Sequence, residues 1–183
     1  DQDILDTLTS LYGRVTSEDK LMLPAGQSVR AFMAESSRQS FQAEDGHDYS
    51  NRCDAEMLDA LVFNVFPNFS PWGGFPPNVV YRWRPNGWDV DSTIMEVLML
   101  KRNPSNGEEL PVADIKWLDE DQDWASAEEV GALGPIFDQD MANLSYVQKG
   151  MKASHRKKVS LANYQEVRVR HFHQIMDRYL YES

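Results

Sequence analysis

Asn78-Val-Val-Tyr-Arg-Trp-Arg84, Pro85-Asn86-Gly87 and Thr93-Ile-Met-Glu-Val-Leu-Met-Leu-Lys-Arg102 together predict a β-hairpin. Both outer segments are rich in β-branched and aromatic residues, which favour strands. The Pro-Asn-Gly sequence between them supplies the residues that a turn requires. An antiparallel strand pair at this point makes a sheet the centre of the predicted fold.

Further strands are expected on both sides of this hairpin. Residues 60–66 are rich in β-branched and aromatic residues and stop at Pro67-Asn68, which predicts a buried strand. Residues 69–77 predict an apolar, turn-rich loop, and residues 112–118 predict another strand after the turn at 103–107. Three or four consecutive strands joined by short turns predict an antiparallel meander.

Helical patterns flank the predicted sheet. Residues 1–58 are mostly polar and predict a largely helical connector, whereas residues 59–183 form the second predicted region. A helical segment is expected over residues 124–133, and Pro135 can begin the next helix. An apolar stripe at helical spacing predicts a last helix over residues 163–181. The predicted class is α+β, an antiparallel sheet with helices packed on it.

Composition narrows the classes of function. The chain has 183 residues and a formal net charge of −11, which disfavours nucleic acid as a partner. No apolar run approaches the roughly 20 residues of a membrane span, and the acidic start Asp1-Gln2-Asp3 is unlike a signal peptide. The single cysteine, Cys53, allows no internal disulfide. These features predict a soluble cytoplasmic protein and, because the chain begins without Met, a piece of a longer one.

Three segments carry a resemblance to a known family. They are Asn64-Val-Phe-Pro-Asn68, the run Gly134-Pro-Ile-Phe-Asp-Gln-Asp140-Met-Ala-Asn143, and Arg170-His-Phe-His-Gln-Ile-Met-Asp-Arg-Tyr-Leu180. Over about residues 50–181 the chain resembles the C-terminal part of the catalytic domain of Rieske-type aromatic-ring-hydroxylating dioxygenases, in the large (α) subunit. The resemblance implies the helix-grip architecture of the START and Bet v 1-like proteins, a curved antiparallel sheet gripped by a long C-terminal helix.

The resemblance also implies a metal ligand. In that family the ligand helix carries Glu/Gln-Asp and, eight residues later, Gln-x-Gly, and Gln139-Asp140 with Gln148-Lys149-Gly150 reproduces this spacing. Asp140, rather than Asp138, is thereby implied as the catalytic carboxylate ligand of a mononuclear Fe(II), which such oxygenases bind with two imidazoles and one carboxylate. The alternative is that both aspartates only favour a helix N-terminus, an effect of about 0.3–1 kcal/mol.

The four histidines do not complete this ligand set. His47 lies alone in a polar loop and is predicted at the surface, and His155 lies among Lys and Arg. His171 and His173 are two residues apart on the predicted last helix, so they face different sides. One cysteine also cannot hold a Rieske [2Fe–2S] centre, which needs two thiolates. We expect the imidazoles and the Rieske centre on an upstream part of the native subunit.

Substrate contacts are expected from apolar side chains, because an aromatic substrate needs a dry pocket. Phe137 is the first candidate, since it lies one helical turn before Asp140 and matches an aromatic residue that lines the pocket in relatives. The other candidates are Leu133, Ile136, Met141 and Phe63. The alternative for each of them is ordinary core packing.

The resemblance implies the rest of the reaction. Electrons from NAD(P)H would pass through a reductase, often with a ferredoxin, to the Rieske centre and then to the mononuclear iron. There O2 would hydroxylate an aromatic or polycyclic substrate, in a homotrimer or an α3β3 assembly. The alternative function is a non-redox module of the same helix-grip fold that binds a hydrophobic ligand between sheet and helix.

Overall fold

The computed structural model describes residues 1–11, 20–76 and 78–182. The chain divides into two compact units, Asp1–Pro111 and Val112–Ser183, and each unit is described by itself. The expected division into residues 1–58 and 59–183 stays a prediction. Three helices do lie before residue 59, and the first strand begins at Leu61.

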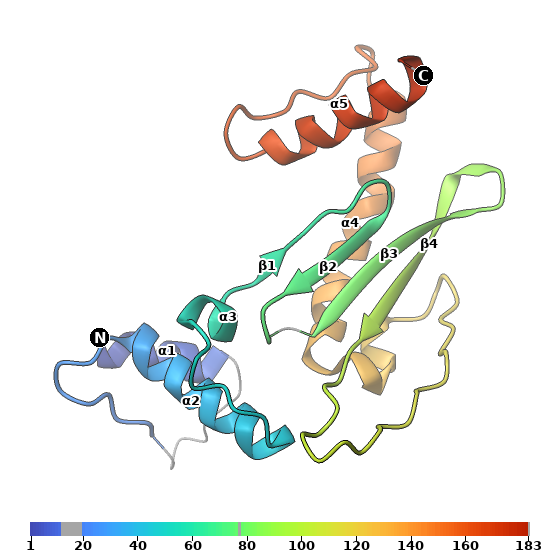
Figure 1. Ribbon diagram of the computed structural model, residues 1–183. Helices are drawn as coiled ribbons and strands as arrows, with labels where there is room; N and C mark the ends of the chain where they lie inside the picture. Colours follow the sequence, from blue (N-terminus) through green and yellow to red (C-terminus); the bar gives the residue numbers. More distant parts are fainter. Residues whose placement is uncertain (12–19, 77, 183) are drawn as a thin grey trace. The chain divides into compact units, whose positions relative to one another are not determined.

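A four-stranded antiparallel sheet occupies the first unit (Figure 1). Its strands are β1 (Leu61–Val62), β2 (Phe69–Gly73), β3 (Val79–Asn86) and β4 (Asp89–Met99). They follow one another in the order β1-β2-β3-β4, so the predicted meander is confirmed. With the helices described below, this sheet makes the protein α+β, as predicted, with the elements of a helix-grip fold.

The β3–β4 hairpin is the longest pairing of the sheet. Its register runs from Val79 opposite Met99 to Pro85 opposite Thr93, and it shifts where Asn86 pairs with Asp89. Gly87 takes a positive φ of 61° in the turn, a conformation that favours glycine. β4 begins at Asp89, four residues before the predicted Thr93, because the tight turn lets pairing resume at once.

Two strand predictions near the hairpin are corrected. The strand expected over residues 60–66 is wrong in extent and in burial, because β1 covers only Leu61–Val62 at the sheet edge and both residues are exposed. The loop expected over residues 69–77 is wrong in its first part, which is β2. Pro71 has no N–H to donate, but its carbonyl still accepts from Phe63 N at 3.0 Å.

Within residues 1–11 and 20–60, which the structure describes, three helices precede the sheet. They are α1 (Gln2–Leu11), α2 (Val29–Asp45) and α3 (Asp54–Leu58), as expected for a largely helical region. Ser28 caps α2 by accepting from Ala31 N at 3.2 Å. Gly46 ends the same helix in the left-handed conformation, with φ of 77°.

The core of the first unit lies between α2, α3 and the loop that joins them. Ala34, Tyr49 and Met57 are almost fully buried, and Phe41, Leu58 and Phe75 pack against them. The ring of Tyr49 meets that of Phe75 edge to face, with centroids 4.9 Å apart. Phe75 N also donates to Glu56 O at 2.8 Å, which ties the end of the β2 loop to α3.

All the regular secondary structure among the described residues of the second unit is helical. It contains two short 3₁₀ helices, η1 (Trp124–Ser126) and η2 (Glu128–Leu133), followed by α4 (Gly134–Ala153) and α5 (Val167–Tyr181). The strand expected over residues 112–118 is wrong, since the described part of this unit holds no strand with which it could pair. Pro135 lies in the first turn of α4, as predicted, and the last helix is confirmed with a start four residues later.

The helical segment expected over residues 124–133 is interrupted. Ala127 is extended between η1 and η2, and Gly131 has a positive φ of 51°, which no regular helix contains. Among the described residues, no helix combines the length and the apolar character needed to cross a membrane.

Candidate functional site

The candidate site lies on α4, on the turns that follow Pro135. Residues 136, 140, 144, 147 and 151 are spaced by three or four, so they share one face of the helix. Four of them are apolar, and each is about half exposed: Ile136, Leu144, Val147 and Met151. We call these four residues the apolar stripe of α4.

Asp140 lies in the middle of the apolar stripe. Its side chain is exposed, with Ile136 one turn before it and Leu144 one turn after it. Within the described part of the chain, its carboxylate has no hydrogen-bond or ion-pair partner. A free carboxylate on an otherwise apolar helix face is available to a cation, and it would be costly to cover without one.

Asp138, the other aspartate of the motif, is fully engaged. Its Oδ1 accepts from Trp124 N at 2.6 Å and its Oδ2 accepts from Ala125 N at 3.2 Å. Both carboxylate oxygens therefore cap η1, which lies before α4 in the chain. The two aspartates thus differ in their contacts, and the contact of Asp138 with η1 was not predicted from the sequence.

Phe137 is buried within the second unit. Its exposed fraction is 4%, and its ring meets that of Trp124 edge to face with centroids 5.3 Å apart. Gly134 lies one turn earlier and is also buried against η1. A Cβ at Gly134 would come within 2.8 Å of Ala125 Cα, so this close contact requires glycine.

The other predicted pocket residues are distributed over both units. Leu133, at the end of η2, and Met141, on α4, are half buried, whereas Ile136 is half exposed. Phe63 belongs to the first unit, follows β1 and is 56% exposed. The structure therefore brings Leu133, Ile136, Phe137, Asp140 and Met141 to one helix start, and their contact with a substrate stays a prediction.

The histidines do not gather around Asp140. His47 is exposed, as predicted, and its Nε2 lies 2.9 Å from Asn103 O. His155 is exposed after α4, and His171 and His173 are exposed on α5. Among the residues the structure describes, no three His, Cys, Asp or Glu side chains lie close enough to hold a metal ion. The residues present therefore fit one ligand of a mononuclear iron site, the carboxylate, and not the whole site.

A buried ionic cluster in the first unit was not predicted. Arg102 Nε donates to Asp45 Oδ2 at 2.7 Å, and Tyr49 also donates to that carboxylate. Burial alone would raise the pKa of Asp45, but hydrogen bonds from Tyr49, Arg102 and the His47 backbone lower it to about 2. The Arg102 guanidinium also lies over the Phe41 ring, 4.5 Å from its centroid. Because every polar group here is satisfied from within the unit, the cluster is structural.

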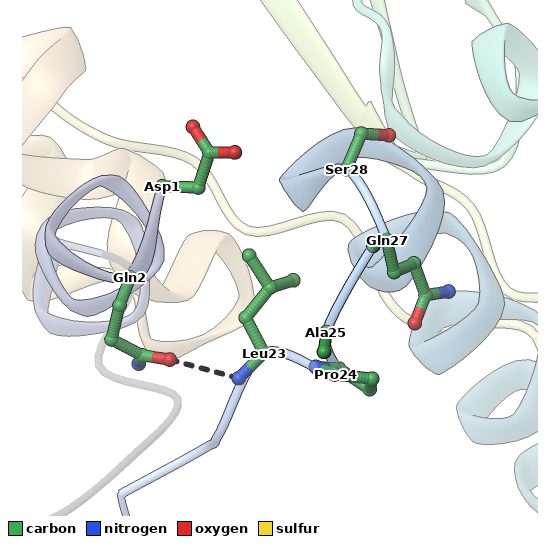
Figure 2. A pocket seen from close by; sticks show the side chains of 8 residues that line it. Asp1, Gln2, Leu23, Pro24, Ala25, Gln27 and Ser28 are labelled. Carbon is green, nitrogen blue, oxygen red and sulfur yellow. Dashed lines mark hydrogen bonds between the residues drawn. The ribbon is translucent and has the colours of Figure 1, made fainter.

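A hollow near the N-terminus has no features of a reaction site. It is lined by Asp1, Gln2 and residues 23–28, as Figure 2 shows. The Gln2 side chain spans it, since its Oε1 accepts from Leu23 N at 2.8 Å and its Nε2 donates to Leu21 O at 2.8 Å. None of the predicted site residues lines this hollow. The hydrogen bonds of Gln2 connect α1 to residues 21–23, so the hollow has a structural explanation.

Comparison with known proteins supports the assignment to a family. The model of the family "ring hydroxylating alpha subunit (catalytic domain)" matches residues 12–182. The search of curated proteins found no match, and neither did the search of solved structures. The family match spans nearly the whole chain and confirms the resemblance drawn from the three motif segments. The chain therefore belongs to the family of ring-hydroxylating alpha subunits, and it is their catalytic domain that it matches.

Proposed function

We propose that this chain is the carboxylate-bearing part of the catalytic domain of a Rieske oxygenase. In this proposal Asp140 is the carboxylate ligand of a mononuclear Fe(II). The substrate is an aromatic or polycyclic compound, hydroxylated with O2 and with electrons from NAD(P)H. Membership of the ring-hydroxylating family supports the reaction class.

One observation carries the role of Asp140. It is an unpartnered carboxylate in the middle of the apolar stripe of α4, whereas Asp138 is occupied by two backbone amides. Covering the apolar stripe would bury the Asp140 charge, which costs several kcal/mol unless a positive group meets it. A bound metal ion supplies that charge, and no described side chain does.

The remaining ligands are proposed to come from elsewhere in the native subunit. When bound, the Fe(II) would supply the O2 chemistry of non-haem oxygenases, which leave open positions beside two imidazoles and a carboxylate. The residues of this chain would hold the carboxylate and keep water away from it. Ile136 and Leu144 flank Asp140, and the part of the pocket wall that the second unit supplies is proposed to include Leu133, Phe137 and Met141.

The proposal includes partners that the reaction requires. A Rieske [2Fe–2S] centre on another part of the subunit would deliver electrons, fed by a reductase with or without a ferredoxin. A trimer of α subunits, alone or with β subunits, is the proposed assembly, and the cytoplasm is the proposed location. The exposed single Cys53 agrees with a reducing compartment.

A second candidate function is favoured by one observation. Among the described residues no three metal-ligating side chains come together, as a redox-inactive helix-grip protein would also show. In that case the apolar stripe would contribute to a cavity for a hydrophobic ligand, and Asp140 would be a polar group at its rim. The two candidates differ in whether removal of the Asp140 carboxylate removes iron.

Iron analysis of two matched variants tests the proposal. Asp140→Ala removes the proposed ligand, and Asp177→Ala removes an exposed aspartate from α5 of the same unit. The native gene product is purified without oxygen, and iron per subunit is measured for both. We expect Asp140→Ala to lose about one iron, the mononuclear one, and Asp177→Ala to lose none. Equal iron in both variants would show that Asp140 is not a ligand, and a wild-type subunit without any iron would favour the hydrophobic-ligand binder.

A further inference from the structure

We propose that Asp138 is a positioning residue that locks η1 onto the first two turns of α4 and so fixes the place of Asp140. This inference rests on the proposed role of Asp140 as a metal ligand and assigns a task to the second aspartate of the motif. Each carboxylate oxygen of Asp138 already accepts a backbone amide, so both are directed at η1.

The contact is a double cap. Trp124 N donates to Oδ1 and Ala125 N donates to Oδ2, at 2.6 and 3.2 Å, so one carboxylate satisfies two amides at the start of η1. Hydrogen bonds to a charged acceptor are roughly twice as strong as neutral ones. The chain between η1 and Asp138 is short, and the bond closes it into a compact loop.

Two neighbours of Asp138 complete this contact. Gly134 and Phe137 lie four and one residues before it, so all three occupy one side of the helix start. Gly134 allows the Ala125 backbone to approach closely, and Phe137 packs its ring on Trp124. We call Gly134, Phe137 and Asp138 the η1 clamp. It leaves the adjacent face, with Asp140 and the apolar stripe, open.

The clamp matters because α4 has no cap of its own. Its N-cap position is Leu133, whose side chain cannot accept a hydrogen bond from the first amides. An uncapped helix start frays, and Asp140 lies in the second turn, within reach of that fraying. The η1 clamp instead fixes the start of α4 through its contacts with η1. A metal ligand must stay within about 0.5 Å of its working position, which a frayed turn would not allow.

The test compares four variants of the native gene product, purified without oxygen. Asp138→Ala removes both acceptors, and Asp138→Asn keeps one. Gly134→Ala leaves Asp138 intact but forces η1 away, so it probes the clamp if Asp138→Ala does not fold. Asp123→Asn is the control, because it removes a neighbouring charge whose side chain makes no cap bond. Two quantities are measured: amide hydrogen exchange of residues 124–125 and the rate of iron loss to a chelator.

We expect Asp138→Ala to speed exchange of the two amides about tenfold or more, since it removes charge-assisted hydrogen bonds. Iron loss should accelerate to a similar extent in Asp138→Ala and in Gly134→Ala. Asp138→Asn should show smaller changes, and Asp123→Asn none. Faster exchange with iron held as tightly as in the wild type would overturn the positioning role, as would unchanged exchange.

Asp140→Ala, measured in the same series, separates this inference from the proposed function. If Asp140→Ala loses the mononuclear iron while the clamp variants retain it normally, only the positioning role of Asp138 fails. If Asp140→Ala keeps that iron, Asp140 is not a ligand, and the positioning role fails with the proposed function.

Discussion

Replacing Arg102 by Met tests the ionic cluster that holds the first unit together. The substitution keeps an apolar stem beside Phe41 but removes the guanidinium that donates to Asp45 at 2.7 Å. Asp45 is only 6% exposed, so its carboxylate would remain buried with Tyr49 and one backbone amide as partners. Removing one partner of a buried ion pair is strongly destabilising, because the other charge is left uncompensated.

The expected size of the effect follows from the Asp45 titration. Its pKa falls from the ordinary 3.8 to about 2 in the folded protein. At about 1.4 kcal/mol per pKa unit this lowering corresponds to about 2 kcal/mol of stability at neutral pH. Losing the cation and its contact with Phe41 adds to this, and measured values for broken buried pairs are about 3–5 kcal/mol. We expect Arg102→Met to lower the free energy of unfolding by about 3 kcal/mol at pH 7.

The lowered pKa of Asp45 also predicts how the stability of the protein changes with pH. Because the folded pKa of Asp45 is depressed, its contribution is fully present above pH 3.8 and is lost as pH falls toward about 2. The wild type should therefore lose more stability over this range than Arg102→Met, because ionised Asp45 contributes less stability once its Arg102 partner is removed. Denaturant unfolding followed by circular dichroism at several pH values measures both quantities. Lys101→Met, which removes an exposed neighbouring charge, is the control. A loss below 1 kcal/mol in Arg102→Met, equal to that of Lys101→Met, would refute the reasoning.

Two further substitutions test the packing around this cluster. Met57→Ala should lower the free energy of unfolding by about 2–5 kcal/mol, since it empties a fully buried site beside Ala34 and Tyr49; a loss under 1 kcal/mol in denaturant unfolding would contradict that. Gly46→Ala should cost about 1 kcal/mol or more, because its φ is +77° and its Cβ would collide with Ser105 Oγ. Thermal unfolding that leaves its midpoint unchanged would count against this conformational argument.

The hairpin could be predicted from sequence because its signals are local. Asn86-Gly87 has residues that suit the turn, and the alternation on either side requires only the neighbouring strand. Pro135 likewise marks the start of α4 by itself, since a first-turn proline needs no partner. Such features depend on a few adjacent residues.

Other elements could not be predicted because they depend on distant partners. The sequence at residues 69–73 has the composition of a turn, yet it is β2, since β1 and β3 lie on either side to accept it. Residues 112–118 alternate like a strand but have no strand partner in the described part of their unit. Alternation of apolar and polar residues shows that a segment can form a strand. Whether a neighbouring strand is present to pair with it depends on the rest of the fold.

The candidate site shows the same division. The spacing of Gln139-Asp140 and Gln148-Lys149-Gly150 singled out Asp140, and the exposed apolar stripe around it is visible as helical periodicity. The cap that Asp138 provides to Trp124 and Ala125 has no such signal, because it joins a side chain to amides more than ten residues away. The Asp45–Arg102 pair was missed for the same reason.

The iron and acid-labile sulfide content of the native gene product, purified without oxygen, tests the central claim most directly. A Rieske centre contributes two irons and two sulfides, and the mononuclear site contributes one iron. We predict about three irons and two sulfides per subunit, in line with the family match over residues 12–182. A native subunit that contains no iron would contradict the oxygenase assignment and leave a protein that binds a hydrophobic ligand.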